Sequence, residues 1–322
     1  MAVYVNTNYS ALQGQRYLGN VQNQLTTTYQ RLSSGMRINS AKDDAAGLQI
    51  ADRLTSQING LNQGNRNASD GIALAQTAEA GMDEISGMLQ KIRTLAVQAN
   101  NGTNTLEDRK ALAKEASALA TEVSRIATQT TYAGKTILNG KQTNSLDPLA
   151  GNAAPPPPQG GGAGADQSIT LQVGSNKGDT ISFNLVNLQF SAASKKAGVP
   201  DAKIDANGGD AIAFKTAADK SITVNFSTAG MASNIIDYMD SLISYVDGQR
   251  ADLGATQNRL ESSIRNQSNV AANEADARSR IRDADFAEES ANLSQQSIIQ
   301  QAAASMLMQA NTRPQLGLSL LG

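Results

Sequence analysis

The residues that could carry chemistry are few, and the clearest are two pairs of closely spaced aspartates. Carboxylates in pairs can act as general acid and base or bind a hard metal ion. The pairs are Asp43 with Asp44 and Asp283 with Asp285. Neither has the wider set of oxygen ligands that Ca²⁺ requires, and adjacent helical residues do not share a face. We interpret both pairs as helix caps and as surface charges that neighbouring basic side chains compensate.

Other reactive residue types are missing. The chain of 322 residues contains no histidine, cysteine or tryptophan, which removes the usual general base, the thiol nucleophile and the soft metal ligands. The glycines at 160–164 suggest a phosphate-binding loop, but no strand precedes them and no Gly-Lys-Ser/Thr follows, so we interpret them as a spacer. We predict a protein that is not an enzyme and has no catalytic residue, cofactor or bound metal.

Charge and hydrophobicity argue against two classes of partner. The formal net charge is -2, so no long-range attraction to nucleic acid or anionic lipid is expected. No segment approaches the roughly 18 consecutive apolar residues of a membrane span. The first residues lack a basic segment followed by an apolar run, so we expect no cleaved signal peptide. We predict neither nucleic acid nor a membrane as a partner.

Apolar residues recur with helical spacing at both ends of the chain. A first series over about 10–36 steps by three and four through Leu18, Val21, Leu25, Tyr29, Leu32 and Met36. A longer series runs from Leu54 to Ala96 as heptads, with one extra three-residue step near Ala75. These patterns predict two helices, the second unusually long.

A reversal and a third helix follow. Residues 100–102, Asn-Asn-Gly, end the long helix, and Thr105 with Asp108 matches a capping box. The heptad spacing continues from Leu112 to Ile126, which predicts a helix lying antiparallel to the long one.

The middle of the chain has a different character. Four prolines at 155–158 precede the glycine-rich spacer, and neither helix nor central strand suits that segment. Four segments rich in strand-forming residues, 168–173, 180–187, 211–215 and 221–226, predict β-hairpins. Helical spacing resumes from Ile235 to Ile264, and a last apolar series runs from Phe286 to Ala310, before Pro314.

The terminal segments are rich in Ala, Ser, Gln and Asn and carry a single apolar stripe each. Such a segment buries too little apolar area to offset its own ordering entropy, so we expect both ends to become ordered only on assembly with copies of the same chain. The expected polymerisation seam comprises Leu25, Leu32, Met36, Phe286, Leu293, Ile299 and Met306.

Several segments resemble bacterial flagellins. Near the N-terminus these are 30–39, QRLSSGMRIN, and 42–48, KDDAAGL. Near the C-terminus they are 250–260, RADLGATQNRL, then 279–289, SRIRDADFAEE, and the segment from 300 to 311. The similarity covers roughly residues 1–140 and 228–322, in the expected order, and so extended a set of matches is specific.

The resemblance implies a mainly α fold: a long antiparallel coiled-coil helical rod built from both terminal segments, with a small β-hairpin-rich central insert. Residues 1–45 and 280–322 would be terminal helices that form an inner tube and are disordered in the monomer. Residues 46–190 and 228–279 would form the rod domain, with the Pro/Gly-rich loop 145–166 and a β-hairpin. Residues 191–227 would be a small, exposed, variable insert.

The function implied is that of a structural subunit that polymerises into the hollow helical filament of the bacterial flagellum and serves motility. Such a subunit is exported unfolded, assembles at the distal tip and remains extracellular. Its partners would be further copies of itself, the export apparatus and its chaperone, the filament cap and the hook-junction proteins. Two alternatives remain: an axial protein of the hook–filament junction, and a coiled-coil adaptor that does not polymerise.

The family resemblance also implies a surface for an animal innate immune receptor. Residues 89–98, LQKIRTLAVQ, resemble the recognised segment, with Lys91 where arginine is common and Thr94 where an acidic residue is common. Since lysine lacks the bidentate fork of arginine, these differences bear on how strongly the receptor binds. The expected surface comprises Lys91, Arg93, Leu95 and Glu122. The alternative is that its charged members are ordinary solvated residues.

Overall fold

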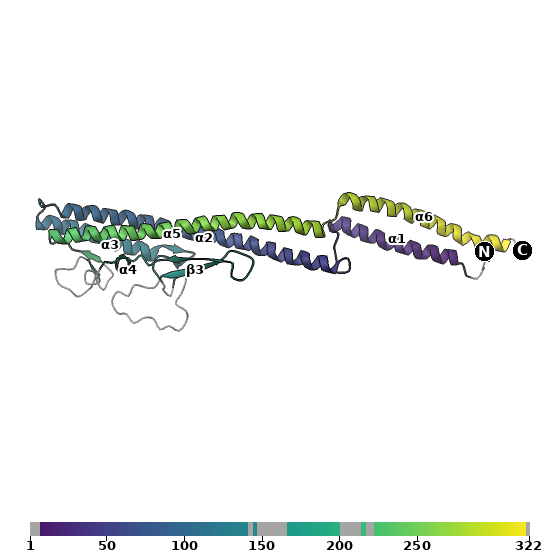
Figure 1. Ribbon diagram of the computed structural model, residues 1–322, viewed down its shortest axis with the longest axis horizontal. Helices are drawn as coiled ribbons and strands as arrows, with labels where there is room; N and C mark the ends of the chain where they lie inside the picture. Colours follow the sequence, from purple (N-terminus) through teal and green to yellow (C-terminus); the bar gives the residue numbers. More distant parts are fainter. Residues whose placement is uncertain (1–6, 141–143, 147–165, 200–213, 217–221, 320–322) are drawn as a thin grey trace, which may run out of the picture. The chain divides into compact units, whose positions relative to one another are not determined.

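The computed structural model describes residues 7–140, 144–146, 166–199, 214–216 and 222–319. Most of the predicted loop 145–166, and parts of the insert 191–227 with residues 211–213 of a predicted strand, lie outside these residues. The described chain divides into two compact units (Figure 1). Unit 1 comprises Met1–Asn59 with Asn269–Gly322, and unit 2 comprises Gly60–Ser268.

Long helices dominate both units. They are α1 (Tyr9–Ser34), α2 (Ala45–Ala99), α3 (Leu106–Gln129), the short α4 (Phe190–Lys196), α5 (Ala229–Arg282) and α6 (Phe286–Ser319). The predicted mainly α fold with a small strand-containing centre is confirmed. The last helix extends beyond the apolar series that predicted it, past Pro314 to Ser319.

The strands in the described part of the chain form three antiparallel hairpins. They are β1 (Thr131–Tyr132) with β2 (Lys135–Thr136), β3 (Gln167–Gln172) with β4 (Thr180–Leu185), and β5 (Phe214–Thr216) with β6 (Ile222–Val224). The two larger hairpins were predicted, with slightly longer strands. No sequence pattern predicted β1, β2 or α4, because two-residue strands and a seven-residue helix are too short to show periodicity.

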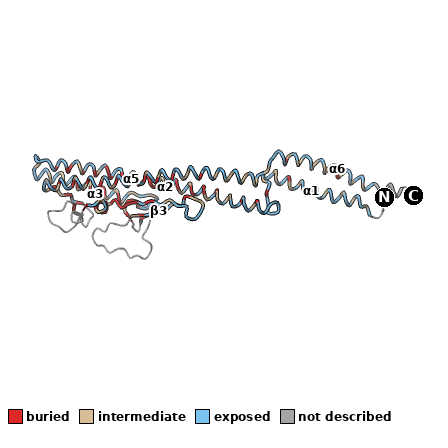
Figure 2. Tube along the Cα trace, in the orientation of Figure 1, coloured by how far each residue is buried: buried red, intermediate tan, exposed pale blue. Residues whose placement is uncertain are grey.

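The core of unit 2 lies where α2, α3 and α5 meet the hairpins. Figure 2 shows buried residues following these elements. The largest buried side chains include Met82, Ile85, Leu89 and Ile92 of α2, Leu242 of α5, and Phe190, Phe214 and Phe226 from the insert side. Phe190 and Phe214 meet edge to face, with ring centroids 5.1 Å apart. The buried face of α2 widens where the sequence has its extra three-residue step, because Leu74, Ala75 and Ala78 are all buried there.

The end of α2 and the start of α3 follow the predicted signals. The long helix ends at Ala99, and the predicted capping box is confirmed. The Thr105 amide donates to Asp108 Oδ2 at 2.9 Å, and the Asp108 amide donates to Thr105 Oγ1 at 3.3 Å. The hydrogen bonds from Thr105 hold the pKa of Asp108 below its usual value.

Glycines of α2 bring the β3–β4 hairpin close to the helix. A Cβ atom on Gly64 would lie 2.0 Å from the carbonyl oxygen of Val173, and one on Gly71 would lie 2.2 Å from Leu171 Cδ1. Gly60 has the same relation to Ser175, at 2.7 Å. A larger residue at Gly60 or Gly64 would force the segment of residues 173–175 away from α2, whereas at Gly71 the flexible Leu171 side chain would have to move.

Unit 1 holds the antiparallel pair α1 and α6 (Figure 1). The chain leaves α1 through Gly35, in the left-handed region at φ 69°. The carbonyl of Gly35 accepts the Ala284 amide at 3.0 Å, and the Arg37 amide donates to the Arg282 carbonyl at 2.7 Å. These bonds join the segment after α1 to the segment before α6.

The paired aspartates lie at these connections. Asp44 Oδ1 accepts the amides of Ala46 and Gly47 at the start of α2, and Asp285 Oδ1 accepts the Ala287 amide at the start of α6. Asp43 Oδ2 accepts two backbone amides of the preceding turn, which hold its pKa below its usual value together with the Ser40 hydroxyl. Asp283 accepts the Ser279 hydroxyl at 2.6 Å. The predicted capping role is confirmed for Asp44 and Asp285, whereas Asp43 and Asp283 accept hydrogen bonds from residues that precede them in the chain. These hydrogen bonds come from amides and hydroxyls, not from the basic side chains that the sequence suggested as partners.

Candidate assembly surface

The pairing of α1 with α6 follows a regular heptad. On α1, most of the buried or half-buried positions form a row that steps by three and four through Ala11, Gly14, Leu18, Val21, Leu25, Thr28 and Leu32. On α6, the same spacing runs through Glu289, Leu293, Gln296, Gln300, Ala303, Leu307 and Ala310. We call these two rows the internal seam. Its members include polar residues, and only four residues of α1 and α6 with described exposure are buried: Val21, Thr28, Glu289 and Ala303.

Polar contacts stabilise the internal seam along its length. Arg31 Nη1 lies 3.0 Å from Glu289 Oε1, and Thr28 Oγ1 donates to Gln296 Oε1 at 3.1 Å. Asn8, the N-cap of α1, donates from Nδ2 to the Ala310 carbonyl at 2.8 Å. These contacts satisfy polar groups that the heptad places between the helices. They set the register of the pair while burying little apolar area.

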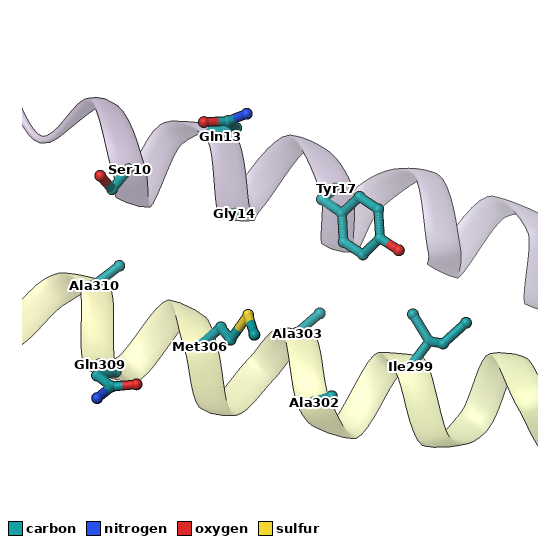
Figure 3. Close-up of a pocket in the computed structure, with 10 residues that line it drawn as sticks. All are labelled: Ser10, Gln13, Gly14, Tyr17, Ile299, Ala302, Ala303, Met306, Gln309 and Ala310. Atoms are coloured by element: carbon teal, nitrogen blue, oxygen red, sulfur yellow. The ribbon is translucent and has the colours of Figure 1, made fainter.

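A groove remains open between the two helices (Figure 3). Its volume is about 730 Å³, and it is lined by Ser10, Gln13, Gly14, Tyr17, Ile299, Ala302, Ala303, Met306, Gln309 and Ala310. The lining carries no charged residue. It offers apolar surface with a few amide and hydroxyl groups, a composition that suits contact with another apolar surface better than chemistry.

Large apolar side chains are exposed around this groove and along both helices. On α1 they are Tyr9, Leu12, Tyr17 and Tyr29, and on α6 Phe286, Ile298, Met306 and Met308. We call these eight residues the outer apolar surface. They range from 52% exposed at Leu12 to 74% at Tyr9. Among the described residues of unit 2, only Val97 and Leu106 are large, apolar and similarly exposed. The concentration of these side chains on α1 and α6 indicates that the two helices carry apolar surface that a single chain leaves uncovered.

Five of the seven predicted seam residues belong to one of these two surfaces. Leu25, Leu32 and Leu293 belong to the internal seam and are half-buried, and Met36 and Ile299 are also half-buried. Phe286 and Met306 instead lie on the outer apolar surface, at 68% and 72% exposed.

The sequence pattern misassigned one position. The apolar series included Tyr29, but Tyr29 is 55% exposed and its neighbour Thr28 is buried. A search for apolar residues passes over a threonine in a heptad position. The usable signal was the strict three-four spacing, which runs 21, 25, 28, 32 and requires residue 28.

The residues of the predicted receptor surface lie in unit 2. Lys91 Nζ on α2 lies 3.6 Å from Glu115 of α3, whereas Arg93 Nε on α2 lies 2.5 Å from Asp240 Oδ1 of α5. The Arg93 guanidinium holds the pKa of Asp240 below its usual value. Leu95 is only 7% exposed and belongs to the core.

Glu122, the fourth predicted residue, lies on α3. Its Oε2 accepts from Arg125 Nε at 2.7 Å, and this hydrogen bond keeps the pKa of the carboxyl group low. The charged members of the predicted surface are therefore each paired within the chain, and all are exposed or half-buried.

Neither a metal site nor a membrane span is evident in the described part of the chain. Over the described ranges, acidic side chains do not gather in groups of three or more that could hold a metal ion. None of the described helices combines the length and the hydropathy needed to cross a bilayer.

Comparison with family models gives two matches, one at each end. Residues 5–143 match the bacterial flagellin N-terminal helical region, and residues 236–321 match the bacterial flagellin C-terminal helical region. Together they cover more than half of the chain, including all of α1 and α6.

Relatives match over the whole length. Flagellin A of Vibrio cholerae is 37% identical over an alignment of 378 positions that covers 100% of both chains. Polar flagellin C of Vibrio parahaemolyticus is 37% identical over 383 positions, again with 100% of both chains covered. Among solved structures, a putative flagellar hook-associated protein from Vibrio parahaemolyticus aligns with 75% of this chain and 100% of its own, at a TM-score of 0.52 and 13% identity. This last likeness concerns the fold alone.

Proposed function

The chain belongs to the bacterial flagellin family, and we propose that its subunits join one another through the outer apolar surface of α1 and α6. It is a structural subunit of the flagellar filament, an extracellular polymer used for motility. The exposed side chains of α1 and α6 indicate where the subunits contact one another.

The proposal rests on how polar and apolar side chains are distributed over α1 and α6. Polar residues such as Thr28, Gln296 and Glu289 fill heptad positions inside the pair, while Phe286 and Ile298 face outward. A helix pair that stood alone would be expected to place its largest apolar residues inside. Covering each outward side chain on assembly contributes about 1–2 kcal/mol. In a homopolymer, identical neighbouring subunits carry the same apolar surface and can cover these side chains.

The proposal assigns roles to the segments of the chain. Residues 1–45 and 280–322 form the inner tube and become ordered on assembly, because the internal seam alone buries little apolar area. Residues 46–190 and 228–279 form the rod domain with its hairpins, supported by the extensive core of unit 2. Residues 191–227 were expected to be exposed, but the described part of this insert packs on unit 2, where Phe214, Ile222, Val224 and Phe226 are buried in the core. Within this scheme, the predicted seam residues Phe286 and Met306 act between subunits and Leu25, Leu32 and Leu293 within one.

Membership of the family supports the remaining partners. We propose export of the unfolded chain with a chaperone, assembly beneath a filament cap, and a junction to the hook, without catalysis at any step. We also propose that the innate receptor contacts Lys91, Arg93 and Glu122, with Leu95 supporting the helix from inside. Reversing the charge at Lys91 should weaken binding of the receptor ectodomain, and unchanged binding would remove that residue from the contact.

Seeded elongation tests the assembly surface. Purified subunits added to short filament seeds should form long tubes, and Ile298→Ser should raise the concentration needed for elongation by roughly tenfold or more. Gln295→Ser, an exposed polar position on the same helix, is the matched control and should elongate normally.

Two outcomes of that assay are decisive. Equal elongation of the Ile298→Ser and Gln295→Ser subunits would exclude α6 as an assembly surface. Failure of the unmodified protein to elongate would favour the junction protein or the adaptor, which do not form long polymers.

A further inference from the structure

The methionines of this chain span the full range of exposure. Met306 and Met308 of α6 are 72% and 65% exposed, whereas Met82 and Met239 in the core of unit 2 are 1% and 0% exposed. Three others, Met36, Met88 and Met231, are half-buried. A thioether sulfur reacts with oxidants in proportion to its access to solvent. The chain therefore contains both reactive and protected methionines.

Met306 differs from Met308 in what it faces. Its side chain projects from α6 into the groove beside α1 and lines it together with Gly14 and Tyr17 (Figure 3). Met308 does not line this groove, because two residues along a helix correspond to a rotation of about 200°. The two residues are exposed to a similar extent on different faces of one helix.

We propose that Met306 is an oxidation site for hydrogen peroxide and organic hydroperoxides, and that its conversion to the sulfoxide stops the subunit from joining a filament. This inference rests on the proposed assembly surface. The oxidation state of the Met306 sulfur then determines whether a neighbouring subunit can cover that surface.

The reaction needs only the peroxide as co-reactant. A lone pair of the thioether sulfur attacks one peroxide oxygen, the S–O bond forms and the O–O bond breaks. The leaving oxygen takes up a proton and departs as water, or as an alcohol from an organic hydroperoxide. Sulfur is oxidised by two electrons and the peroxide is reduced by two.

The product changes the groove from apolar to polar at one point. A sulfoxide oxygen is a hydrogen-bond acceptor, and burying it without a donor disfavours association. On the α1 side the groove is lined by Ser10, Gln13, Gly14 and Tyr17, and covering Met306 with a second apolar surface would remove the water that hydrates a sulfoxide at this position. The oxidised subunit should therefore need a concentration on the order of tenfold to a hundredfold higher to elongate a filament.

Oxidation kinetics test the site assignment. Dilute subunits are treated with hydrogen peroxide, the reaction is quenched, and peptides are quantified by mass spectrometry. Met306 and Met308 should gain oxygen at similar rates, on the order of tenfold or more faster than Met82 and Met239. In assembled filaments Met306 should react at least several-fold more slowly than in free subunits. Equal rates at the four positions, or no protection of Met306 by assembly, would overturn the proposal.

Variants test the effect on assembly. Each variant is compared with its own untreated sample, and peroxide should impair elongation by Met306→Leu subunits much less than elongation by Met308→Leu subunits, because leucine at 306 keeps the apolar volume of the groove without an oxidisable sulfur. Met308→Leu subunits, the matched control, should lose elongation as the oxidised wild type does. Methionine sulfoxide reductase should restore elongation of the wild type.

The results also separate this inference from the proposed function. An equal loss of elongation on treatment of Met306→Leu and Met308→Leu subunits, or retention of elongation by treated wild type, would overturn the role of Met306. Untreated wild type that fails to elongate would contradict the proposed function instead, and the protection measurement would then fail as well.

Discussion

Single residues decide how closely the elements of unit 2 approach. Gly64 is the clearest case, because its α-carbon leaves room for the Val173 carbonyl, and a Cβ there would lie 2.0 Å from that oxygen. Backbone cannot move aside as a flexible side chain can. Gly87, on the same helix, provides the comparison, because a Cβ added there would meet no atom within 4 Å.

Exchanging these glycines for alanine should have opposite effects. In an exposed helix position, alanine is more stable than glycine by about 0.5–1 kcal/mol, so Gly87→Ala should raise the free energy of unfolding. Gly64→Ala should lower it by about 1–3 kcal/mol, because the hairpin must shift. Denaturant titration of the full chain measures both. Stabilisation by Gly64→Ala would show that the hairpin is not held against α2.

The seam residues show how far apolar spacing can predict a site. It identified Val21, Leu25 and Leu32 on the internal seam, but it selected Tyr29 over Thr28. The buried threonine is stabilised by a hydrogen bond from its hydroxyl to Gln296, 268 positions away in the chain. No local pattern reveals such a partner.

At the scale of elements, the helix caps could be predicted from the sequence because the residues that form them are close together in the chain. Thr105 and Asp108 lie three residues apart, and the geometry of the helix start fixes how they bond. The small hairpin β1–β2 and helix α4 were not readable, since their stability comes from packing on a core assembled from distant segments. The sequence likewise did not indicate that these glycines of α2 allow close packing, because that role depends on which element lies opposite the helix.

The capping box makes the start of α3 sensitive to acid. The pKa of Asp108 lies below its usual value of 3.8, so its stabilising contribution is complete above pH 3.8 and is lost as the pH falls through the lower, folded-state pKa. The pKa values of Asp43, Glu122 and Asp240 are shifted in the same direction. The free energy of unfolding should therefore decline in strong acid.

The Asp108→Asn variant isolates the acid-dependent loss of stability that comes from the capping box. The variant should be less stable than the wild type at pH 7 and should lose less stability between about pH 7 and about pH 2–3, because asparagine does not titrate. Thr105→Ala, which removes the partner hydroxyl, should cost about 1 kcal/mol at neutral pH. Denaturation midpoints across this pH range provide the measurement, and parallel pH profiles for variant and wild type would contradict the assignment.

At the scale of the whole molecule, the two units differ in how much of their apolar surface a single chain buries. Unit 2 has a large core with buried residues from helices and hairpins alike. Over the residues with described exposure, the terminal helices of unit 1 bury only four side chains and expose eight large apolar ones. The family's function as a polymer subunit accounts for this asymmetry, because the missing contacts can come from identical neighbours.

Amide hydrogen exchange, compared between dilute subunits and assembled filaments, tests this account most directly. We expect amides of α1 and α6 to exchange rapidly in the free subunit and to become strongly protected in the filament, while those of α2, α3 and α5 within unit 2 are protected in both. Strong protection of α1 and α6 in subunits too dilute to associate would contradict the account, as would rapid exchange of these helices in the filament.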